Sequence, residues 1–202
     1  GGWSSFTHRT SARDGVVVTT LFPSAGVLHA FHSGYDATPR RGRVTRVDGR
    51  VLSEIDGRPA ARVYDEWTAG TIGQEVEARD GSVLAATTLH PIGRQVGEVA
   101  GAPYYVLSHP ARVTADQGLA LFTQVDEGDL IVSMNGSVRS LERRAGLVAQ
   151  AALATHALEA NDVAGGLVIY CAGCRLAVGD RMPAVVEALN RALPGKPFLG
   201  TF

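Results

Sequence analysis

The sequence has few cysteines, no long hydrophobic run and almost no net charge. It contains two cysteines among 202 residues, and its formal net charge is −1. A chain of this charge has no general attraction to nucleic acid or to an anionic membrane, so we expect neither as a partner. No apolar run reaches the length that spans a bilayer, and the first residues lack the basic-then-apolar pattern of a signal peptide. Because the two cysteines lie only three residues apart, they form no disulfide framework, and a cytoplasmic location is the simpler expectation.

The motifs of several enzyme classes are also absent. The sequence has no Gly-x-Ser-x-Gly, no phosphate-binding Gly-x4-Gly-Lys and no Gly-x-Gly-x-x-Gly. His29 and His32 lie three residues apart on an expected strand and therefore point to opposite faces, which excludes a shared metal ion. The densest basic cluster, residues 40–43, has no aromatic residue among its arginines and is interpreted as a solvated turn. We therefore expect no catalytic residue and no metal site, and predict that the chain is not an enzyme.

Hydrophobic periodicity predicts a strand-rich first part followed by mixed strands and helices. Strands are predicted at residues 16–22, 27–33, 44–47, 51–55, 83–89, 104–108, 119–125, 130–134, 167–170 and 198–202. Helices are predicted from Pro59, over residues 141–158 and from about Asp180. Hairpins are expected between the first two strands, at Asp48-Gly49, and between residues 119–125 and 130–134. This order predicts an α+β fold with a mixed, partly antiparallel sheet and a few packed helices.

The stretch from Gly165 to Pro183 is the first candidate for a site. Its apolar run at residues 167–170 predicts a strand buried on both faces, and Pro183 suits the first turn of the helix that follows. Between them, Arg175 to Val178 is expected to be extended. Strand ends that lead into helices are where parallel sheets bind ligands.

Cys171-Ala-Gly-Cys174 lies within that stretch. A Cys-x-x-Cys pair beside a βαβ pattern can be a dithiol redox centre, and that chemistry favours a first cysteine at a helix N-terminus. Because the helix is expected to begin near Asp180, Cys171 is better interpreted as a small hydrophobe at a strand end. Structural zinc would need two further ligands that the spacing does not supply. A thiol redox or metal-thiolate role for Cys171 and Cys174 is kept as an alternative.

Arginines near the predicted strand ends are candidates for holding a small carboxylate. A guanidinium group binds a carboxylate through two parallel hydrogen bonds. The competing interpretation is that each arginine forms a surface ion pair with one of the 20 acidic residues. The residues predicted to bind ligand are Arg175, Cys171, Gly173, Arg94, Tyr104 and Arg181.

A series of short segments occurs in the order seen in FIST (F-box and intracellular signal transduction) proteins. The segments are Leu52–Ala60 with Tyr64, His90–Gly93, Pro103–Tyr104, Pro110–Val113 and Val125–Gly128. Leu167–Gly179 resembles the family's Cys-x-Gly-Arg-x-Leu-x-x-Gly turn, and Phe198–Phe202 resembles the strand that follows. Cys174 stands where the family commonly has arginine, so the Cys-x-x-Cys spacing is interpreted as incidental, with Arg175 standing in.

The resemblance implies a sensory, non-catalytic module that binds a small ligand such as an amino acid and acts with a signalling protein or domain. It also implies a division into residues 1–58, the end of the N-terminal segment, and residues 59–202, a C-terminal domain truncated at its end. Some family members bind haem and sense nitric oxide, so a haem-binding gas sensor is an alternative. His90, His109, His156 and Cys171 are the candidate axial ligands, but none lies in a haem signature, and no stoichiometric haem is expected.

Overall fold

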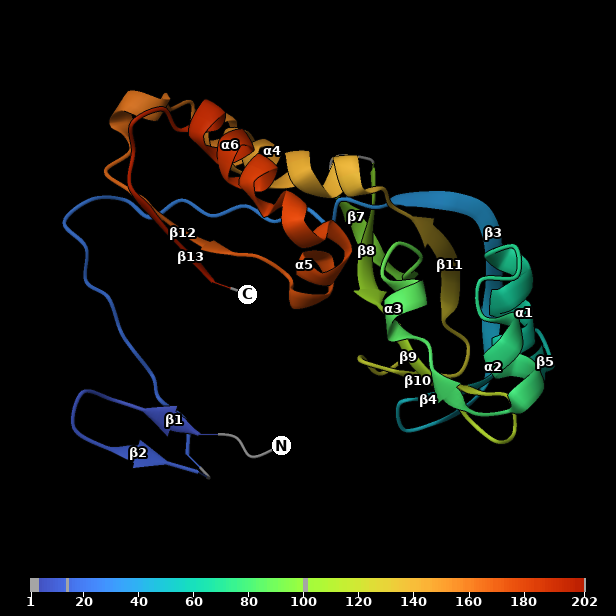
Figure 1. Cartoon of the computed structure of the whole chain (residues 1–202). Helices are drawn as coiled ribbons and strands as arrows, with labels where there is room; N and C mark the ends of the chain where they lie inside the picture. The colour runs from blue at the N-terminus through green and yellow to red at the C-terminus, as the bar shows by residue number, and fades with distance from the viewer. Residues whose placement is uncertain (1–3, 14, 100–101, 202) are drawn as a thin grey trace.

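The computed structural model describes residues 4–13, 15–99 and 102–201, and the chain folds as an α+β protein around one large antiparallel sheet (Figure 1). The predicted fold class is therefore confirmed. The sheet has nine strands in the order β6-β9-β10-β4-β3-β11-β7-β8, with β5 paired to β4. These strands are β3 (Asp36–Asp48), β4 (Val51–Ile55), β5 (Arg58–Pro59), β6 (Gly81–Ser82), β7 (Ile92–Val99), β8 (Ala102–Ser108), β9 (Pro110–Val113), β10 (Leu119–Leu121) and β11 (Leu130–Asn135).

The hairpin predicted at Asp48-Gly49 joins β3 to β4, and Gly49 takes the positive φ of 56° that this tight turn requires. The hairpin predicted between residues 119–125 and 130–134 is wrong. The two strands form, but β4 and β3 lie between β10 and β11 in the sheet. The connecting loop instead hydrogen-bonds to β3, where Val44 exchanges backbone bonds with Gly128 and Asp129.

Residues 15–34, all of which the structure describes, form no strand, so the first predicted hairpin is also wrong. The chain before them has only the short pair β1 (Ser5–Phe6) and β2 (Ser11–Ala12). Apolar side chains of this segment stay exposed, with Val16 at 88% and Phe22 at 92%. A β-rich run becomes a strand only where a partner strand or packing surface receives it, and this segment meets neither.

One hydrophobic core joins the sheet to the first helices, α1 (Ala60–Trp67) and α2 (Gly73–Ala78). Residues 83–89, predicted as a strand, form instead the short helix α3 (Leu84–Thr87), whose leucine and alanines favour helix. Val44, Leu52 and Ile55 belong to the same core as later residues such as Leu119. The predicted boundary near residue 58 therefore does not separate two hydrophobic cores.

A second core packs three C-terminal helices against the other face of β11. These helices are α4 (Val138–Thr155), α5 (Ala172–Val178) and α6 (Met182–Ala192). Along β11, Ile131 lies in the first core whereas Val132 and Met134 lie in the second, as strand alternation requires. The helix α4 begins at Val138, three residues before the predicted start at residue 141, because Ser137 is its N-cap and Ser137 and Ser140 satisfy each other's backbone N–H groups.

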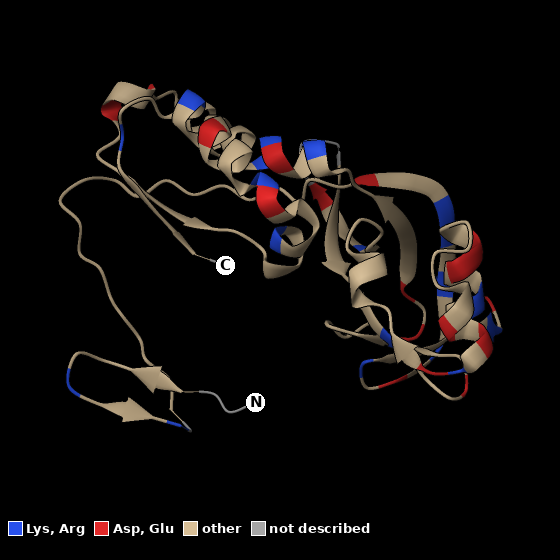
Figure 2. Cartoon of the chain, viewed as in Figure 1, with Lys and Arg blue, Asp and Glu red and all other residues tan. Residues whose placement is uncertain are grey.

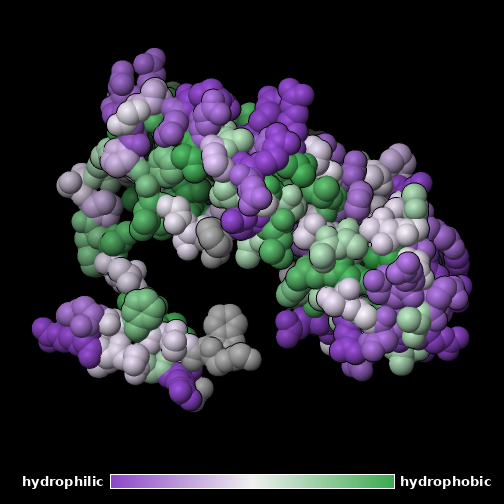
Figure 3. Space-filling model, in the orientation of Figure 1, coloured by the Kyte–Doolittle hydropathy of each residue, from purple (hydrophilic) through white to green (hydrophobic). Residues whose placement is uncertain are grey.

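The predicted strand at residues 167–170 forms as β12 (Gly166–Ile169), parallel to β13 (Phe198–Thr201). The sequence predicted that this strand is buried on both faces. That prediction is wrong, because Leu167 is 65% exposed and Ile169 is 77% exposed. A two-stranded sheet with helices on one side leaves its other face uncovered. Figures 2 and 3 show a hydrophobic, uncharged surface over β12, β13 and the segment of residues 15–34. The helices α1, α2 and α4, in contrast, present charged residues.

Candidate functional site

The two cysteines lie at the start of α5, a helix that includes Arg175–Val178, which the sequence predicted to be extended. That prediction is wrong: Cys171 is the N-cap residue, and Cys174 lies in the first turn of the helix. Cys171 is exposed to solvent, whereas Cys174 is 1% exposed and belongs to the second core. Reactive Cys-x-x-Cys pairs favour a first cysteine at a helix N-terminus, and the structure places Cys171 at such a position, which the sequence did not predict.

The buried Cys174 sulfur lies among polar groups contributed by distant parts of the chain. It is 3.4 Å from the Tyr35 hydroxyl oxygen and 3.4 Å from Nη1 of Arg144, which donates to it. Tyr35 in turn donates to the Thr88 carbonyl at 2.8 Å. This group, Cys171, Cys174, Tyr35 and Arg144, is called the thiol cluster below.

Arg144 is a buried cation, 9% exposed, on α4. Its guanidinium carbon lies 5.0 Å from the centre of the Tyr170 ring, and Nη1 also donates to the Ser33 carbonyl. Within the described residues no carboxylate lies within ion-pair distance of Arg144. The guanidinium group is instead held by its hydrogen bonds to the Ser33 carbonyl and the Cys174 sulfur and by the face of the Tyr170 ring.

The two sulfurs differ in proton affinity. A hydrogen bond from the Cys174 thiol, helped by the backbone N–H groups of Cys174 and Gly173, lowers the pKa of Cys171 from 9.0 to about 5. The same hydrogen bond, together with burial, raises the pKa of Cys174. Burial also raises the pKa of Tyr35. At neutral pH the cluster therefore holds a thiolate at Cys171 and a proton at Cys174.

His109, between β8 and β9, lies beside the thiol cluster. Its ring meets the Tyr35 ring edge-on, with centroids 5.9 Å apart, and Nδ1 is 3.2 Å from the Thr87 carbonyl oxygen. Burial lowers the pKa of His109, so it is neutral at pH 7. When protonated it would favour the Cys171 thiolate.

An open depression of about 320 Å³ lies on the same side of the sheet as the thiol cluster. Its walls are Tyr105, Leu130 and Val132, and Arg41 pairs with Val132 across β3 and β11, which places both side chains on this face. Arg41 lies on a strand, so the predicted solvated turn is wrong. The depression is lined by Ala37, Thr38, Pro39, Arg41, Gln95, Tyr105, Leu130 and Val132.

The structure separates the residues predicted to share a ligand site. Arg94 forms an ion pair with Asp129, Nη1 to Oδ2 at 3.4 Å, and Arg181 forms one with the buried Glu142. A Cβ on Gly93 would meet Met134 and Tyr105 of the second core, so the next residue, Arg94, points to the opposite face of the sheet. Arg94 and Arg181 therefore form ion pairs with acidic residues, as the competing interpretation of these arginines predicted.

The remaining predicted residues lie on α5 and β8. Cys171, Gly173 and Arg175 share α5, and Arg175 donates to the Gly179 carbonyl at 3.0 Å. Tyr104 is 41% exposed, opposite Gly97 on β7. Sequence reasoning did not select Tyr35, Arg144 or Arg41. Nothing local marks them, because their roles come from segments far apart in the chain.

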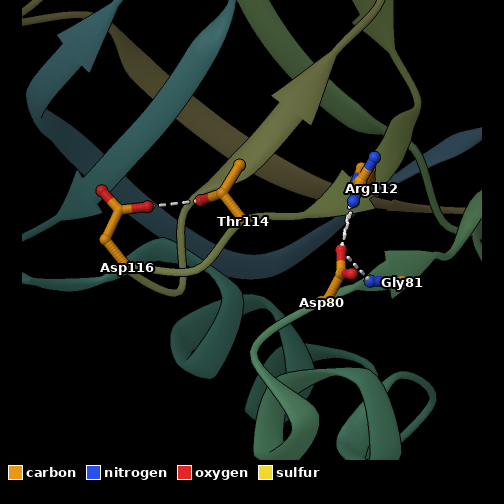
Figure 4. A network of polar contacts seen from close by, with 5 residues as sticks. All are labelled: Asp80, Gly81, Arg112, Thr114 and Asp116. Carbon is orange, nitrogen blue, oxygen red and sulfur yellow. Dashed lines mark hydrogen bonds and ion pairs between the residues drawn. The ribbon is translucent and has the colours of Figure 1, made fainter.

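A second depression, near the β6–β9 edge, contains charges that satisfy one another (Figure 4). Arg112 forms an ion pair with Asp80, and this hydrogen-bonded partner lowers the pKa of Asp80. The Thr114 hydroxyl donates to Asp116 and lowers its pKa in the same way. These two exposed pairs are matched within themselves, and Arg79 also lines the depression.

In the described part of the chain, no group of three or more His, Cys, Asp or Glu residues could hold a metal ion. No helix among those residues is both long and apolar enough to cross a membrane.

Comparison with known proteins gives two family matches. The FIST N domain matches residues 2–58, and the FIST C domain matches residues 60–202. Searches of curated proteins and of solved structures found no match.

Proposed function

This chain belongs to the FIST family, and from that premise we propose that it binds a small carboxylate ligand, such as an amino acid, without chemical turnover. FIST domains are sensory modules of signal transduction. The proposed binding site is the depression on β3, β11, β7 and β8, and the proposed output is an interaction with a signalling protein or domain. The observation that carries the proposal is the state of Arg41 in that depression.

Arg41 differs from the other arginines on its strand. Arg40 donates to main-chain carbonyls of α1, Arg43 donates to Gly128, and Arg46 forms an ion pair with Glu54. Across the residues that the structure describes, the Arg41 side chain has no hydrogen-bond or ion-pair partner. A guanidinium group free in a depression can take a carboxylate through two parallel hydrogen bonds.

The walls of the depression suit the rest of such a ligand. Tyr105, Leu130 and Val132 offer apolar surface, while Gln95 and Thr38 offer polar groups at its rim. Few polar groups among apolar walls are typical of small-molecule sites, and about 320 Å³ is at the small end of their range. The size favours a ligand no larger than an amino acid.

Haem, the alternative cofactor, fits neither depression that the structure describes. Neither is lined by histidine or cysteine, the axial ligands named from the sequence. His109 is engaged with Tyr35 and Thr87, and His156 is the exposed C-cap residue of α4. The residues present therefore favour an organic acid over haem.

A thermal-shift screen of free amino acids and related acids, under reducing conditions, tests the proposal. A ligand that binds only the folded chain stabilises it by about 2.7 kcal/mol at a hundredfold excess over Kd. Arg41→Met should abolish the shift, whereas Arg139→Met, an exposed arginine on α4, should retain it. No shift with any acid would contradict the proposal. A shift lost in Arg175→Met but kept in Arg41→Met would place the site on α5, as the sequence predicted.

A further inference from the structure

We propose that Cys171 and Cys174 form a peroxide-oxidisable dithiol, in which a hydroperoxide oxidises the exposed Cys171 and the buried Cys174 then closes an intramolecular disulfide. The proposal is independent of the small-ligand site. It rests on the placement of the two sulfurs, on Arg144 and on the contacts that a disulfide would break.

The placement of the sulfurs suits the two successive steps. Cys171 is exposed, so a small oxidant in solution can reach it, whereas Cys174 is shielded from solvent. Residues three apart in a helical turn are neighbours, and the Cys174 thiol is the largest cause of the lowered pKa of Cys171. A disulfide needs Cβ atoms about 3.8 Å apart, closer than the roughly 5–6 Å between neighbours within a helix, so closing it requires the backbone at the N-cap, where Cys171 lies outside the helix, to adjust.

Arg144 supplies an independent observation. It is buried without a carboxylate partner in the described structure, and it donates to the Cys174 sulfur at 3.4 Å. A cation beside a thiol favours its thiolate, and Arg144 works against the rise in the pKa of Cys174. It therefore assists the step in which the Cys174 sulfur attacks the oxidised Cys171.

The chemistry balances with a hydroperoxide as the oxidant. The Cys171 thiolate attacks the distal peroxide oxygen, the O–O bond breaks, and the leaving hydroxide or alkoxide takes a proton to become water or an alcohol. The Cys171 sulfenic acid then reacts with the Cys174 thiol. The new S–S bond forms as the S–O bond breaks, and the sulfenic oxygen leaves as water with the thiol proton. Two sulfurs lose two electrons in total, and one peroxide gains them.

Oxidation should also change the surrounding structure. Closing the disulfide draws the Cys174 sulfur toward Cys171 and away from the Tyr35 hydroxyl and Arg144, which weakens both of those contacts. Arg144 also holds the Ser33 carbonyl, and Tyr35 holds the Thr88 carbonyl. The oxidised protein is therefore less stable where residues 33–35 meet α4 and α5.

The test treats the reduced full-length chain with hydrogen peroxide and follows its mass, its free thiols and its melting temperature. We expect a loss of two hydrogens and of both free thiols, a lower melting temperature, and full recovery with dithiothreitol. In Cys174→Ser, and in Cys174→Ala as a second variant, a dione probe should instead trap sulfenic acid at Cys171. Cys171→Ser should show neither product.

Arg144 gives the matched comparison. Arg144→Met should slow disulfide formation at neutral pH, because without this cation the pKa of Cys174 rises further, and the Cys174 thiolate that closes the disulfide becomes about tenfold rarer for each unit of that rise. Arg143→Met, an exposed arginine next to it on α4, should leave the rate unchanged. If wild-type Cys171 stays reduced, or gains two oxygens while Cys174 stays free, the dithiol proposal is wrong. An equal rate in wild type and Arg144→Met would remove the role assigned to Arg144.

Discussion

At the scale of single residues, the thiol cluster depends on a backbone position that glycine occupies. Gly34 has a φ of +78°, and a Cβ at this position would lie 2.6 Å from Cδ of Arg144. The chain immediately before Tyr35 must therefore pass close to the stem of Arg144 to bring the tyrosine against Cys174. Both the conformation and the contact exclude a larger residue without strain.

Gly34→Ala should lower the free energy of unfolding by about 1–3 kcal/mol, because alanine is strained at this φ and displaces Arg144. Gly26→Ala is the control, since nothing lies within 4 Å of a Cβ there and its φ is not positive. Equal urea unfolding curves for the two variants would contradict this account.

Tyr64→Phe should destabilise the first core by about 1–3 kcal/mol, because it leaves a buried carbonyl without its donor. Tyr64 is fully buried, and its hydroxyl donates to the His90 carbonyl at 2.6 Å. Tyr104→Phe removes a hydroxyl from a residue that is 41% exposed and should change stability little. Chemical denaturation of the three proteins measures the difference.

At the scale of elements, the close crossing of α4 and α6 holds the second core together. Gly146 on α4 faces the backbone of α6, where a Cβ would lie 2.6 Å from the Ala188 carbonyl oxygen. Leu141 and Ala145 of α4 pack with Val185 and Leu189 of α6 in the second core. This contact fixes α4, and through it the position of Arg144 beside α5.

Gly146→Ala should lower stability by about 1–3 kcal/mol through overpacking at the crossing. Helix propensity alone predicts a gain of roughly 0.5–1 kcal/mol for the same change, so the sign separates the two effects. Leu147→Ala, at a neighbouring position that is 45% exposed, is the control and should have a smaller effect. A rise in melting temperature for Gly146→Ala would show that α6 can move away.

At the scale of the whole molecule, residues 4–13 and 15–32 lie outside both hydrophobic cores (Figure 1). Limited proteolysis of the full chain should therefore cut first between residues 16 and 31, where large apolar side chains are exposed. The fragment that keeps Ser33, Gly34 and Tyr35 should melt within a few degrees of the uncut protein. Early cuts within the large sheet would contradict this arrangement.

Burial of two histidines gives the whole protein a pH dependence. Burial lowers the pKa of His90 and of His109 below the ordinary 6.5. The unfolded chain therefore binds more protons, so stability is highest above pH 6.5 and is lost as the pH falls from there toward the folded-state values. The lowered pKa of Cys171 acts in the same direction. The melting temperature should fall from pH 7.5 to pH 5.5, and less steeply in the His90→Gln, His109→Gln double variant.

The sequence by itself determined the α+β class, the Asp48-Gly49 turn, the helix after Pro59 and the family resemblance. Turn chemistry and helix periodicity act over a few residues, and they are legible without the rest of the chain. The same local reasoning failed at residues 16–33, at Leu84–Thr87 and at Arg175–Val178. In each of these places strand or helix depends on whether a neighbouring element packs there.

Only the tertiary structure decided the candidate sites. Tyr35 is more than a hundred positions from both Arg144 and Cys174 in the sequence, and the second core brings the three side chains together. Arg41 is a candidate because the fold places it beside Val132 in a depression. Arg94 and Arg181 instead form ion pairs with Asp129 and Glu142. A charge or a thiol acquires its reactivity from desolvation and from the groups that face it, and these are properties of packing that residue order alone does not specify.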